Sequence, residues 1–235
     1  MDSSASRGRL AALQTEIVAC RRCARLAEHC QTVAGVKRRA YLDWEYWGRP
    51  VPSFGDPDAR LLLVGLAPGA HGANRTGRVF TGDSSGDFLY EALFQTGFAS
   101  QPEATSRDDG LVLRDCYIAS AVRCAPPQNR PLPHEFAACR PFLEREVSML
   151  PQLRAVVTLG RLAHDSWLAI LRARDASVRA RDYPFAHGRH FFCPGNEPDL
   201  LCSYHPSRQN TQTGRLTKSM LINVLQTAKE IFSDV

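Results

Sequence analysis

The sequence contains no apolar run that approaches the length of a membrane-spanning helix. Its first residues, MDSSASRGRL, also lack the hydrophobic region of a secretory signal peptide. These two absences exclude the membrane-spanning class and lead us to expect a soluble, cytoplasmic protein with no membrane partner. Lysine is scarce as well, so arginine supplies most of the net charge of +5, which by itself supports nucleic-acid binding only weakly.

No internal repeat or low-complexity tract divides the 235 residues, of which 44% are hydrophobic. A chain of this length and composition can bury one sizeable core. We therefore expect a single domain over residues 1–235. Within this domain, residues 1–59 would form an N-terminal helix, a CxxC pair and a wrapping segment, and residues 60–235 would form an α/β core.

Four short apolar runs alternate with helical patterns along the expected core. They are LLLVGL, DCYIASAV, RAVVTLG and DLLCSY, which begin at residues 61, 115, 154 and 199. The first run is typical of a strand that is buried on both faces of a parallel sheet. Ser84 or Ser85 is expected to cap the helix after it, and Pro133 to start the helix after the second run. The pattern predicts a three-layer α/β/α sandwich around a mainly parallel, four-stranded sheet.

Further elements are expected at the two ends of the chain. Leu10, Leu13 and Ile17 form the apolar stripe of a helix near the N-terminus, and a last helix is expected over residues 218–232. Between the third and fourth runs, the His-Gly turn at His187 is expected to close a hairpin.

A polar loop follows the first predicted strand, at the edge of the sheet where ligands bind in open α/β folds. It extends from Gly65 to Asp83 and lacks both GxGxxG and the GK-Ser/Thr ending of a P-loop, so the usual phosphate-binding loops are disfavoured. It does offer backbone amides, Asn74, and Phe80 before a Thr-Gly-Asp turn. The alternative interpretation is a glycine loop that serves packing alone.

A second polar loop, residues 205–217, follows the last predicted strand. It contains no pair of metal ligands and no Ser/His/Asp set. His205, followed by side-chain amides and by Arg208 and Arg215, is suited to donating a hydrogen bond to a developing anion while the loop contacts phosphates. The alternative is a histidine that only caps a turn.

The spacing of the eight cysteines is more informative than their number, because a cytosolic chain is not expected to form a disulfide framework. Cys20 and Cys23 form a CxxC pair, while Cys124 precedes a proline-rich loop and Cys139 follows on the next helix. These two pairs could enclose an iron–sulfur cubane or a zinc ion, with Cys30 as the one rival ligand. The other cysteines, interpreted as small buried hydrophobes, are Cys116, Cys193 and Cys202.

Basic and aromatic residues alternate between the CxxC pair and the first predicted strand. Such a segment can bind nucleic acid, but a wrapping segment also needs large side chains to cover apolar surface, and we favour wrapping. Arg38, Arg39 and Arg49 would remain free to contact phosphates. The aromatic residues of the segment are Tyr41, Trp44, Tyr46 and Trp47.

Taken together, GLAPGAHGANRTGRVFTGD, VRCAPPQNRP, HPSRQNTQTGR and the four cysteines resemble the family 5 (type b) uracil-DNA glycosylases, the iron–sulfur branch of that superfamily. The resemblance spans about Cys20 to Leu225. It implies a monofunctional base-excision repair enzyme that hydrolyses the N-glycosidic bond of a deaminated base in DNA and leaves an abasic site. The implied partner is double-stranded and also single-stranded DNA, met by a monomer associated with the nucleoid.

The resemblance also implies roles for individual residues. Cys20, Cys23, Cys124 and Cys139 would hold a structural [4Fe-4S] cluster. In the base pocket, Phe80 would stack on the extruded base and His205 would contact the uracil carbonyl as it gains negative charge. The other residues of the implied pocket are Gly65, Ala67, Pro68, Gly69 and Ser120. The implied DNA contacts are Arg75, Arg78, Ser207, Arg208, Gln209, Asn210, Gln212 and Arg215.

Two positions set expectations for catalysis and for substrate range. Many superfamily members carry Asp or Asn where this chain has Ala67, so another residue must position the water, and we expect Asn74 first and Asp83 second. Ser120 stands where related enzymes often have Asn. Because a hydroxyl makes fewer fixed hydrogen bonds than an amide, we expect activity on hypoxanthine, xanthine and cytosine adducts as well as uracil.

Two other classes of function stay open at this point. One is a non-catalytic nucleic-acid or redox-sensing module whose cluster responds to oxidants. The other is a zinc domain that hydrolyses a small nucleoside.

Overall fold

The computed structural model describes residues 3–193, 195 and 197–232, so both ends of the predicted domain lie outside the described residues. A six-stranded sheet crosses its centre in the order β1-β3-β2-β4-β6-β5. The strands are β1 (Phe54–Gly55), β2 (Leu61–Gly65), β3 (Cys116–Ser120), β4 (Ala155–Leu159), β5 (His190–Phe191) and β6 (Asp199–Ser203). The inner strands β2, β3, β4 and β6 are parallel and are the four predicted ones.

The two edge strands correct the predicted count of four. Both are antiparallel and only two residues long, which is too short to show an alternating pattern in the sequence. The hairpin predicted at His187, near β5, is wrong. The segment after the turn pairs with β6 instead, with His190 opposite Leu201 and Phe191 opposite Leu200.

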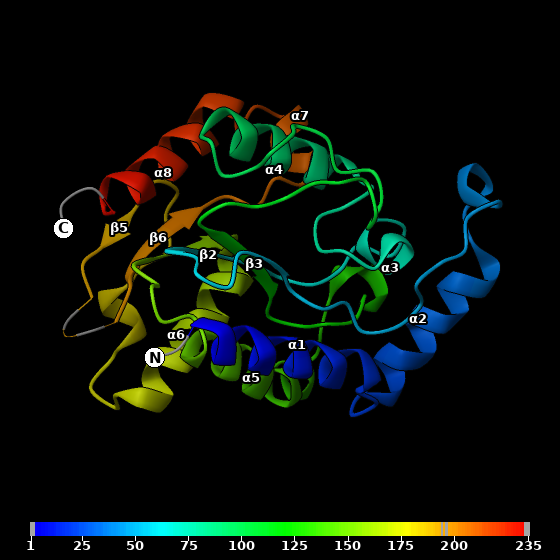
Figure 1. The fold of residues 1–235 in the computed structure, drawn as a ribbon, viewed down its shortest axis with the longest axis horizontal. Helices are drawn as coiled ribbons and strands as arrows, with labels where there is room; N and C mark the ends of the chain where they lie inside the picture. The colour runs from blue at the N-terminus through cyan, green and yellow to red at the C-terminus, as the bar shows by residue number, and fades with distance from the viewer. Residues whose placement is uncertain (1–2, 194, 196, 233–235) are drawn as a thin grey trace.

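Helices cover both faces of the sheet (Figure 1). They are α1 (Ser3–Ala19), α2 (Ala24–Val36), α3 (Ala73–Thr76), α4 (Ser84–Gln95), α5 (Pro133–Ser148), α6 (Arg161–Arg174), α7 (Arg208–Gln212) and α8 (Lys218–Glu230), with short 3-10 turns at Arg39–Tyr41, Pro127–Asn129 and Ala180–Asp182. In Figure 1, α4 and α8 lie above the sheet and α1, α5 and α6 below it. The predicted α/β/α sandwich is confirmed.

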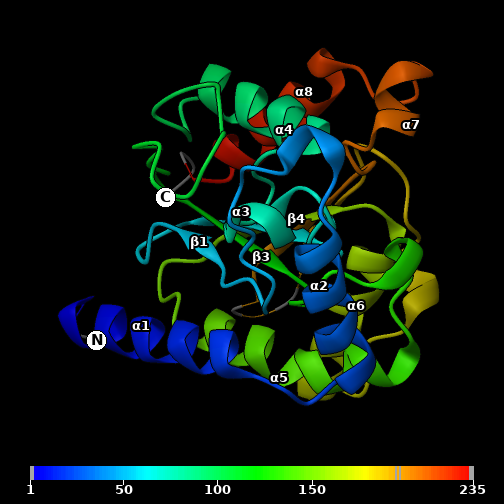
Figure 2. The same ribbon diagram turned by 90° about the vertical axis from the view of Figure 1, so that its right-hand side faces the viewer.

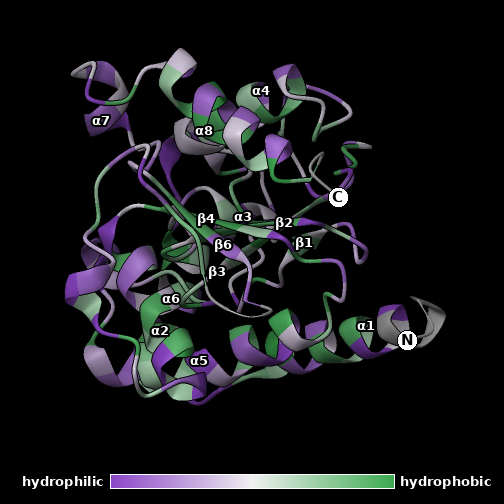
Figure 3. Ribbon diagram, turned by 90° about the vertical axis from the view of Figure 1, so that its left-hand side faces the viewer, coloured by the Kyte–Doolittle hydropathy of each residue, from purple (hydrophilic) through white to green (hydrophobic). Residues whose placement is uncertain are grey.

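Successive side chains of β2 point to opposite faces of the sheet, and both faces are covered by helices. This explains why a strand without polar residues lies at the centre of the sheet. Leu61 and Leu63 pack in the core beneath α4 and α8, while Leu62 and Val64 pack in the core against α5 and α6. Figure 3 shows the strands of the sheet coloured as largely hydrophobic between the two helical layers.

Two helix starts differ in how well the sequence predicted them. Helix α5 begins at Pro133 as expected. Helix α4 is capped by Asp83 rather than by Ser84 or Ser85, because the Asp83 side chain accepts hydrogen bonds from the backbone N–H groups of Ser85 and Gly86. This places a carboxylate at the edge of the sheet where the loop after β2 ends.

The N-terminal segment wraps one end of the core. Leu10, Leu13 and Ile17 of α1 are buried as predicted, and α1 packs along α5. Helix α2, which the sequence analysis did not predict, then rises to α3 (Figure 2). Within the described part of the chain, no helix is long and apolar enough to cross a membrane.

Candidate active site

A cavity of about 260 Å³ opens at the carboxyl ends of β2 and β6. It is walled by the loop after β2, the start of α4, the end of β3 and the loop after β6. The predicted site residues that line it are Ala67, Pro68, Gly69, Phe80, Asp83, Ser120, His205 and Ser207. The two polar loops that the sequence analysis singled out therefore face each other across one cavity.

Gly65, the remaining predicted pocket residue, is not among the lining residues but lies against the ring of Phe80. A Cβ atom at Gly65 would stand 2.7 Å from Cε2 and 2.9 Å from Cζ of Phe80, so a side chain here would collide with the aromatic ring. The glycine thus permits the Phe80 ring to lie directly on the end of β2.

Phe80 and His205 meet across the cavity. Their ring centroids are 5.8 Å apart and the ring planes are inclined by 32°. Burial lowers the pKa of His205 to about 4, so its imidazole is neutral at physiological pH. In the described part of the chain neither ring nitrogen has a hydrogen-bond partner, while the carbonyl oxygen of His205 accepts a bond of 2.8 Å from Asn210 Nδ2. The neutral ring is free to donate to a ligand.

Asp83 supplies the one carboxylate among the described residues that line the cavity. Its Oδ1 atom accepts from Ser85 N at 3.0 Å and from Gly86 N at 3.1 Å. Its Oδ2 atom faces the preceding loop so closely that a Cβ atom at Gly72 would lie 1.9 Å from it. Burial raises the pKa of Asp83, although the two N–H bonds oppose the shift. One oxygen is thus fixed by the helix, while the other lies against the backbone of Gly69 and Gly72.

Asn74, the first choice for positioning water, does not line the cavity. It is fully buried in α3, and its Nδ2 atom donates to the carbonyl oxygens of Cys30 at 3.3 Å and Ala70 at 3.4 Å. The physical reason is that α2 packs on α3, where the carbonyl oxygen of Cys30 accepts from the amide. Of the two candidates for positioning water, Asp83 lines the cavity and Asn74 does not.

Arg75 and Arg78 were expected to contact DNA, and the structure gives both an internal role. Arg75 is 4% exposed and its guanidinium lies 3.9 Å from the ring centre of Tyr41 and 4.0 Å from that of Trp44. Arg78 is 3% exposed and forms an ion pair with Asp109. Neither guanidinium can reach a phosphate in this conformation. The aromatic segment before β1 therefore wraps the core, as the sequence analysis favoured.

The second polar loop predicted from the sequence, residues 205–217, follows β6. Residues 208–212 form the short helix α7, which is capped by Ser207. The side-chain amide of Asn210 donates a hydrogen bond to the backbone carbonyl oxygen of His205. The side chains that remain exposed beside the cavity are those of Arg208, Gln209, Gln212 and Arg215.

Asn129 is a lining residue that the sequence analysis missed. It follows β3 in the proline-rich loop, where its φ of 56° is one that Asn adopts more readily than most residues. The turn signal Pro-Gln-Asn was visible in the sequence, but this loop was interpreted only as a support for cysteines. The other lining residues that were not predicted are Leu66, Ala73, Val79 and Ser85.

The four predicted cysteine ligands line one small cavity behind the site. Cys20 and Cys23 reach it from the turn between α1 and α2, Cys124 from the loop after β3, and Cys139 from α5. Cys30, the rival ligand, does not line this cavity; its thiol donates to the carbonyl oxygen of Ala125 at 3.7 Å and also contacts the thiol of Cys124. Among the described residues no group of three or more His, Cys, Asp or Glu side chains stands ready to hold a metal ion, so the cluster stays a prediction.

Comparison with known proteins identifies the family. A family model described as the uracil DNA glycosylase superfamily matches residues 52–229, a range that includes every lining residue of the cavity between Phe80 and His205. The chain belongs to this superfamily. The predicted resemblance is thereby confirmed at the level of the superfamily.

Curated relatives of this superfamily member carry a more specific name. A type-5 uracil-DNA glycosylase of Thermus thermophilus is 51% identical over 92% of this chain and 94% of its own length. A protein of the same name from Pyrobaculum aerophilum is 47% identical over 90% of this chain and 88% of its own length. A type-4 enzyme of Sulfurisphaera tokodaii is 32% identical, but over only 50% of this chain. The predicted type-5 branch is confirmed.

Among solved structures, wild-type SMUG2 of Pedobacter heparinus matches 76% of this chain and 77% of its own, with 16% identity and a TM-score of 0.44.

The close approach of Phe80 to Gly65 gives a direct test of the site geometry. We expect Gly65→Ala to lower the free energy of unfolding by about 1–3 kcal/mol, because the new methyl group overpacks the Phe80 ring. The matched control is Gly35→Ala in α2, where a Cβ atom would meet nothing within 4 Å. Urea unfolding of both variants measures the difference. Equal stability of the two variants would contradict the close approach of Phe80 to Gly65.

Proposed function

We propose that this protein removes uracil from DNA by hydrolysing the N-glycosidic bond, and that it leaves an abasic site without cutting the strand. The observation that carries the proposal is the approach of Phe80 and His205 to 5.8 Å across one cavity. The two rings are close enough for one base to stack on Phe80 while its edge reaches the imidazole of His205. The names of the type-5 relatives point to the same reaction.

The base must leave the duplex before it can enter the cavity. Extruding a nucleotide costs a few kcal/mol, and the cost is smallest for a mispaired base such as uracil opposite guanine. Stacking on an aromatic side chain returns about 1–3 kcal/mol per base. The ring of Phe80 is the aromatic surface in the cavity that supplies this stacking. Base flipping is therefore part of the proposal.

His205 acts on the leaving group as the bond breaks. The base becomes anionic and the sugar cationic, so a fixed donor at the base lowers the barrier. The pKa of about 4 keeps the imidazole neutral, and a neutral ring donates through one N–H without adding a full charge to the cavity. Losing such a preorganised donor typically costs about a hundredfold or more in rate.

Asp83 is placed to orient the attacking water. Its Oδ1 atom is held by the start of α4, which fixes the carboxylate, and its Oδ2 atom has no hydrogen-bond partner in the described part of the chain. We assign the attacking water to Oδ2, which lies beside Gly69 of the cavity lining. Ala67, which stands where many superfamily members carry Asp or Asn, lines the same cavity.

Ser120 and Asn129 are the polar side chains available for reading the edge of the base. Both line the cavity, and Ser120 is 3% exposed. A serine hydroxyl rotates to donate or accept, so it tolerates several edges. We therefore include hypoxanthine, xanthine and cytosine adducts among the substrates. The exposed rim of α7 supplies Arg208 and Arg215 to phosphates of double-stranded or single-stranded DNA, bound by a monomer.

The four cysteines that share one cavity fit an iron–sulfur cluster. Thiolates are the usual ligands of such clusters, and these four converge from three separate segments. A bound [4Fe-4S] cluster would supply a covalent bridge among those segments. Cys124 and Asn129 belong to the same loop, so a bridge at Cys124 would brace the wall of the base cavity. The role is structural, since no cysteine of the set lines that cavity.

The reaction is tested by an excision panel on synthetic duplexes and single strands. Oligonucleotides with one uracil, hypoxanthine, xanthine or cytosine adduct are incubated with the protein, and abasic sites are cleaved by mild alkali. We expect cleavage at uracil and at some of the other bases. His205→Ala should retain DNA binding and lose about a hundredfold or more of the single-turnover rate.

Absence of abasic sites on every substrate would contradict the proposed activity and favour a non-catalytic binding module. Activity confined to uracil would contradict the role given to Ser120. Near-normal excision by His205→Ala would remove His205 from the mechanism while leaving the activity itself in place.

A second prediction separates the two duties of Asp83. Asparagine also caps helices well, so Asp83→Asn should keep α4 and the melting temperature while it removes the carboxylate charge. We expect the single-turnover excision rate to fall by about a hundredfold or more. The matched variant Asn74→Ala should excise at a rate closer to wild type, provided that it folds. The opposite ranking would restore Asn74 as the residue that positions water.

A third prediction concerns the metal content. Protein purified without oxygen should be brown, with a broad absorption band between the violet and blue, and should contain about four iron and four sulfide per chain. Cys139→Ser should lose the colour and a large part of the stability, whereas Cys30→Ser should keep the colour. Colourless protein with stoichiometric zinc would contradict the cluster.

A further inference from the structure

The backbone of Phe80 adopts an unusual conformation. Its φ of 50° lies in the left-handed region, which is unfavourable for a residue with a bulky side chain. Such a conformation persists only where the surrounding structure fixes it, and it tends to mark functional sites. The groups that hold the turn around Phe80 therefore decide where its ring lies.

Hydrogen bonds hold the turn on both sides of Phe80. Before it, the carbonyl oxygen of Val79 accepts from the hydroxyl of Tyr90 at 3.0 Å. After it, Gly82 donates its N–H to the carbonyl oxygen of Ala104 at 3.1 Å and accepts from Arg75 Nη2 at 2.7 Å. Ala104 belongs to the acidic loop of residues 101–112, which precedes β3. The bond to Ala104 shows that this loop takes part in the support.

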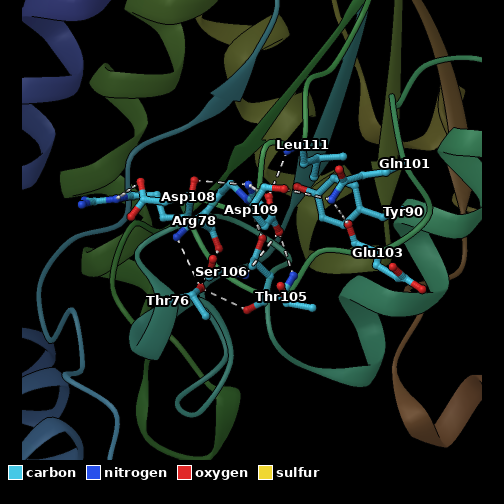
Figure 4. A network of polar contacts seen from close by, with 12 residues as sticks. Thr76, Arg78, Tyr90, Gln101, Glu103, Thr105, Ser106, Asp108, Asp109 and Leu111 are labelled. Carbon is cyan, nitrogen blue, oxygen red and sulfur yellow. Dashed lines mark hydrogen bonds and ion pairs between the residues drawn. The ribbon is translucent and has the colours of Figure 1, made fainter.

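The strongest of these contacts is the buried ion pair between Arg78 and Asp109 (Figure 4). Arg78 Nη1 donates to Oδ1 at 2.8 Å and Nη2 donates to Oδ2 at 2.6 Å, a bidentate arrangement. Arg78 Nε also donates to Thr81 Oγ1 at 2.9 Å. One guanidinium therefore links the acidic loop to the residues on both sides of Phe80.

Asp109 is itself held by the loop to which it belongs. Its carboxylate accepts from the backbone N–H groups of Thr105 at 2.9 Å and Leu111 at 3.0 Å. Burial alone would raise the pKa of Asp109, but the bonds from Arg78 and from the backbone outweigh burial and lower it to about 2. The pair stays charged over the whole working pH range. A charged pair buried at 3% and 9% side-chain exposure fixes its geometry firmly, because every alternative leaves an unpaired charge.

We propose that Arg78 and Asp109 are positioning residues for base excision, which act by holding Phe80 at the place where it stacks on the extruded base. The acidic loop of residues 101–112 is then a working part of the base pocket rather than a simple connection. The inference rests on the proposed function, since it presumes that Phe80 contacts the base. It gives the buried Arg78 a role in place of the DNA contact expected from the sequence.

A double-mutant cycle tests this role against a purely structural one. Single-turnover excision of uracil is measured for the wild type, Asp109→Asn, Phe80→Leu and the double variant, each well below its melting temperature. We expect Asp109→Asn to slow excision by at least about tenfold, because small displacements of a positioned group cost this much. In the Phe80→Leu background the same change should slow excision by less than about twofold.

Two further variants complete the design. Asp108→Asn is the matched control, because the Asp108 side chain is 88% exposed and makes only a distant contact with Arg107, at 3.9 Å. It should excise at the wild-type rate. Tyr90→Phe removes one hydrogen bond to Val79 and keeps the buried ring, so it decides the question if Asp109→Asn does not fold. It should also slow excision, and again less in the Phe80→Leu background. Affinity for undamaged duplex should be unchanged in all of these variants.

The outcomes separate this inference from the proposed function. Equal slowing by Asp109→Asn in both backgrounds would overturn the inference and make the ion pair a stabiliser of the fold alone. A wild-type rate for Asp109→Asn would overturn it as well. A wild-type rate for Phe80→Leu would instead overturn the stacking role of Phe80, and with it both the inference and that part of the proposed function.

Discussion

The contact between Phe80 and His205 is the constraint on which the arrangement of the site depends. The two rings come from loops that follow β2 and β6, strands that are separated along the chain by most of the α/β core and flank β4 in the sheet. Because these strands are parallel, their loops leave the same edge. Two glycines leave space for the two residues. A Cβ atom at Gly65 would collide with the Phe80 ring, and a Cβ atom at Gly160, at the end of β4, would lie 3.1 Å from the Cβ atom of His205.

Burial of the titratable side chains shapes the chemistry of the cavity. Burial keeps His205 neutral and raises the pKa of Asp83, so the two titratable groups of the lining are both shifted toward their uncharged forms. The backbone N–H groups of the helix cap and the charge of Arg75 oppose the shift at Asp83. A site with so few ionisable groups suits a reaction in which the leaving group brings its own negative charge. Its strength comes from placement of groups before reaction rather than from their number.

The sequence predicted the parts of this structure that local pattern determines. Strands buried on both faces show as unbroken apolar runs, and Pro133 marks a helix start. It did not predict the two-residue edge strands, which carry no pattern, or the directions of buried polar side chains. The fate of Arg78 depends on Asp109, a residue 31 positions away, and that of Asn74 on α2, which packs against it. Such partners become visible only when the chain is folded.

The central claim, that the buried imidazole of His205 is neutral, is tested most directly by a titration of the protein with nitrogen-15-labelled histidine. The ring nitrogen shifts of His205, assigned by comparison with His205→Gln, report its protonation at each pH. The structure predicts one protonated nitrogen at neutral pH and a pKa of about 4. A pKa at or above the ordinary histidine value of about 6.5 would contradict the account.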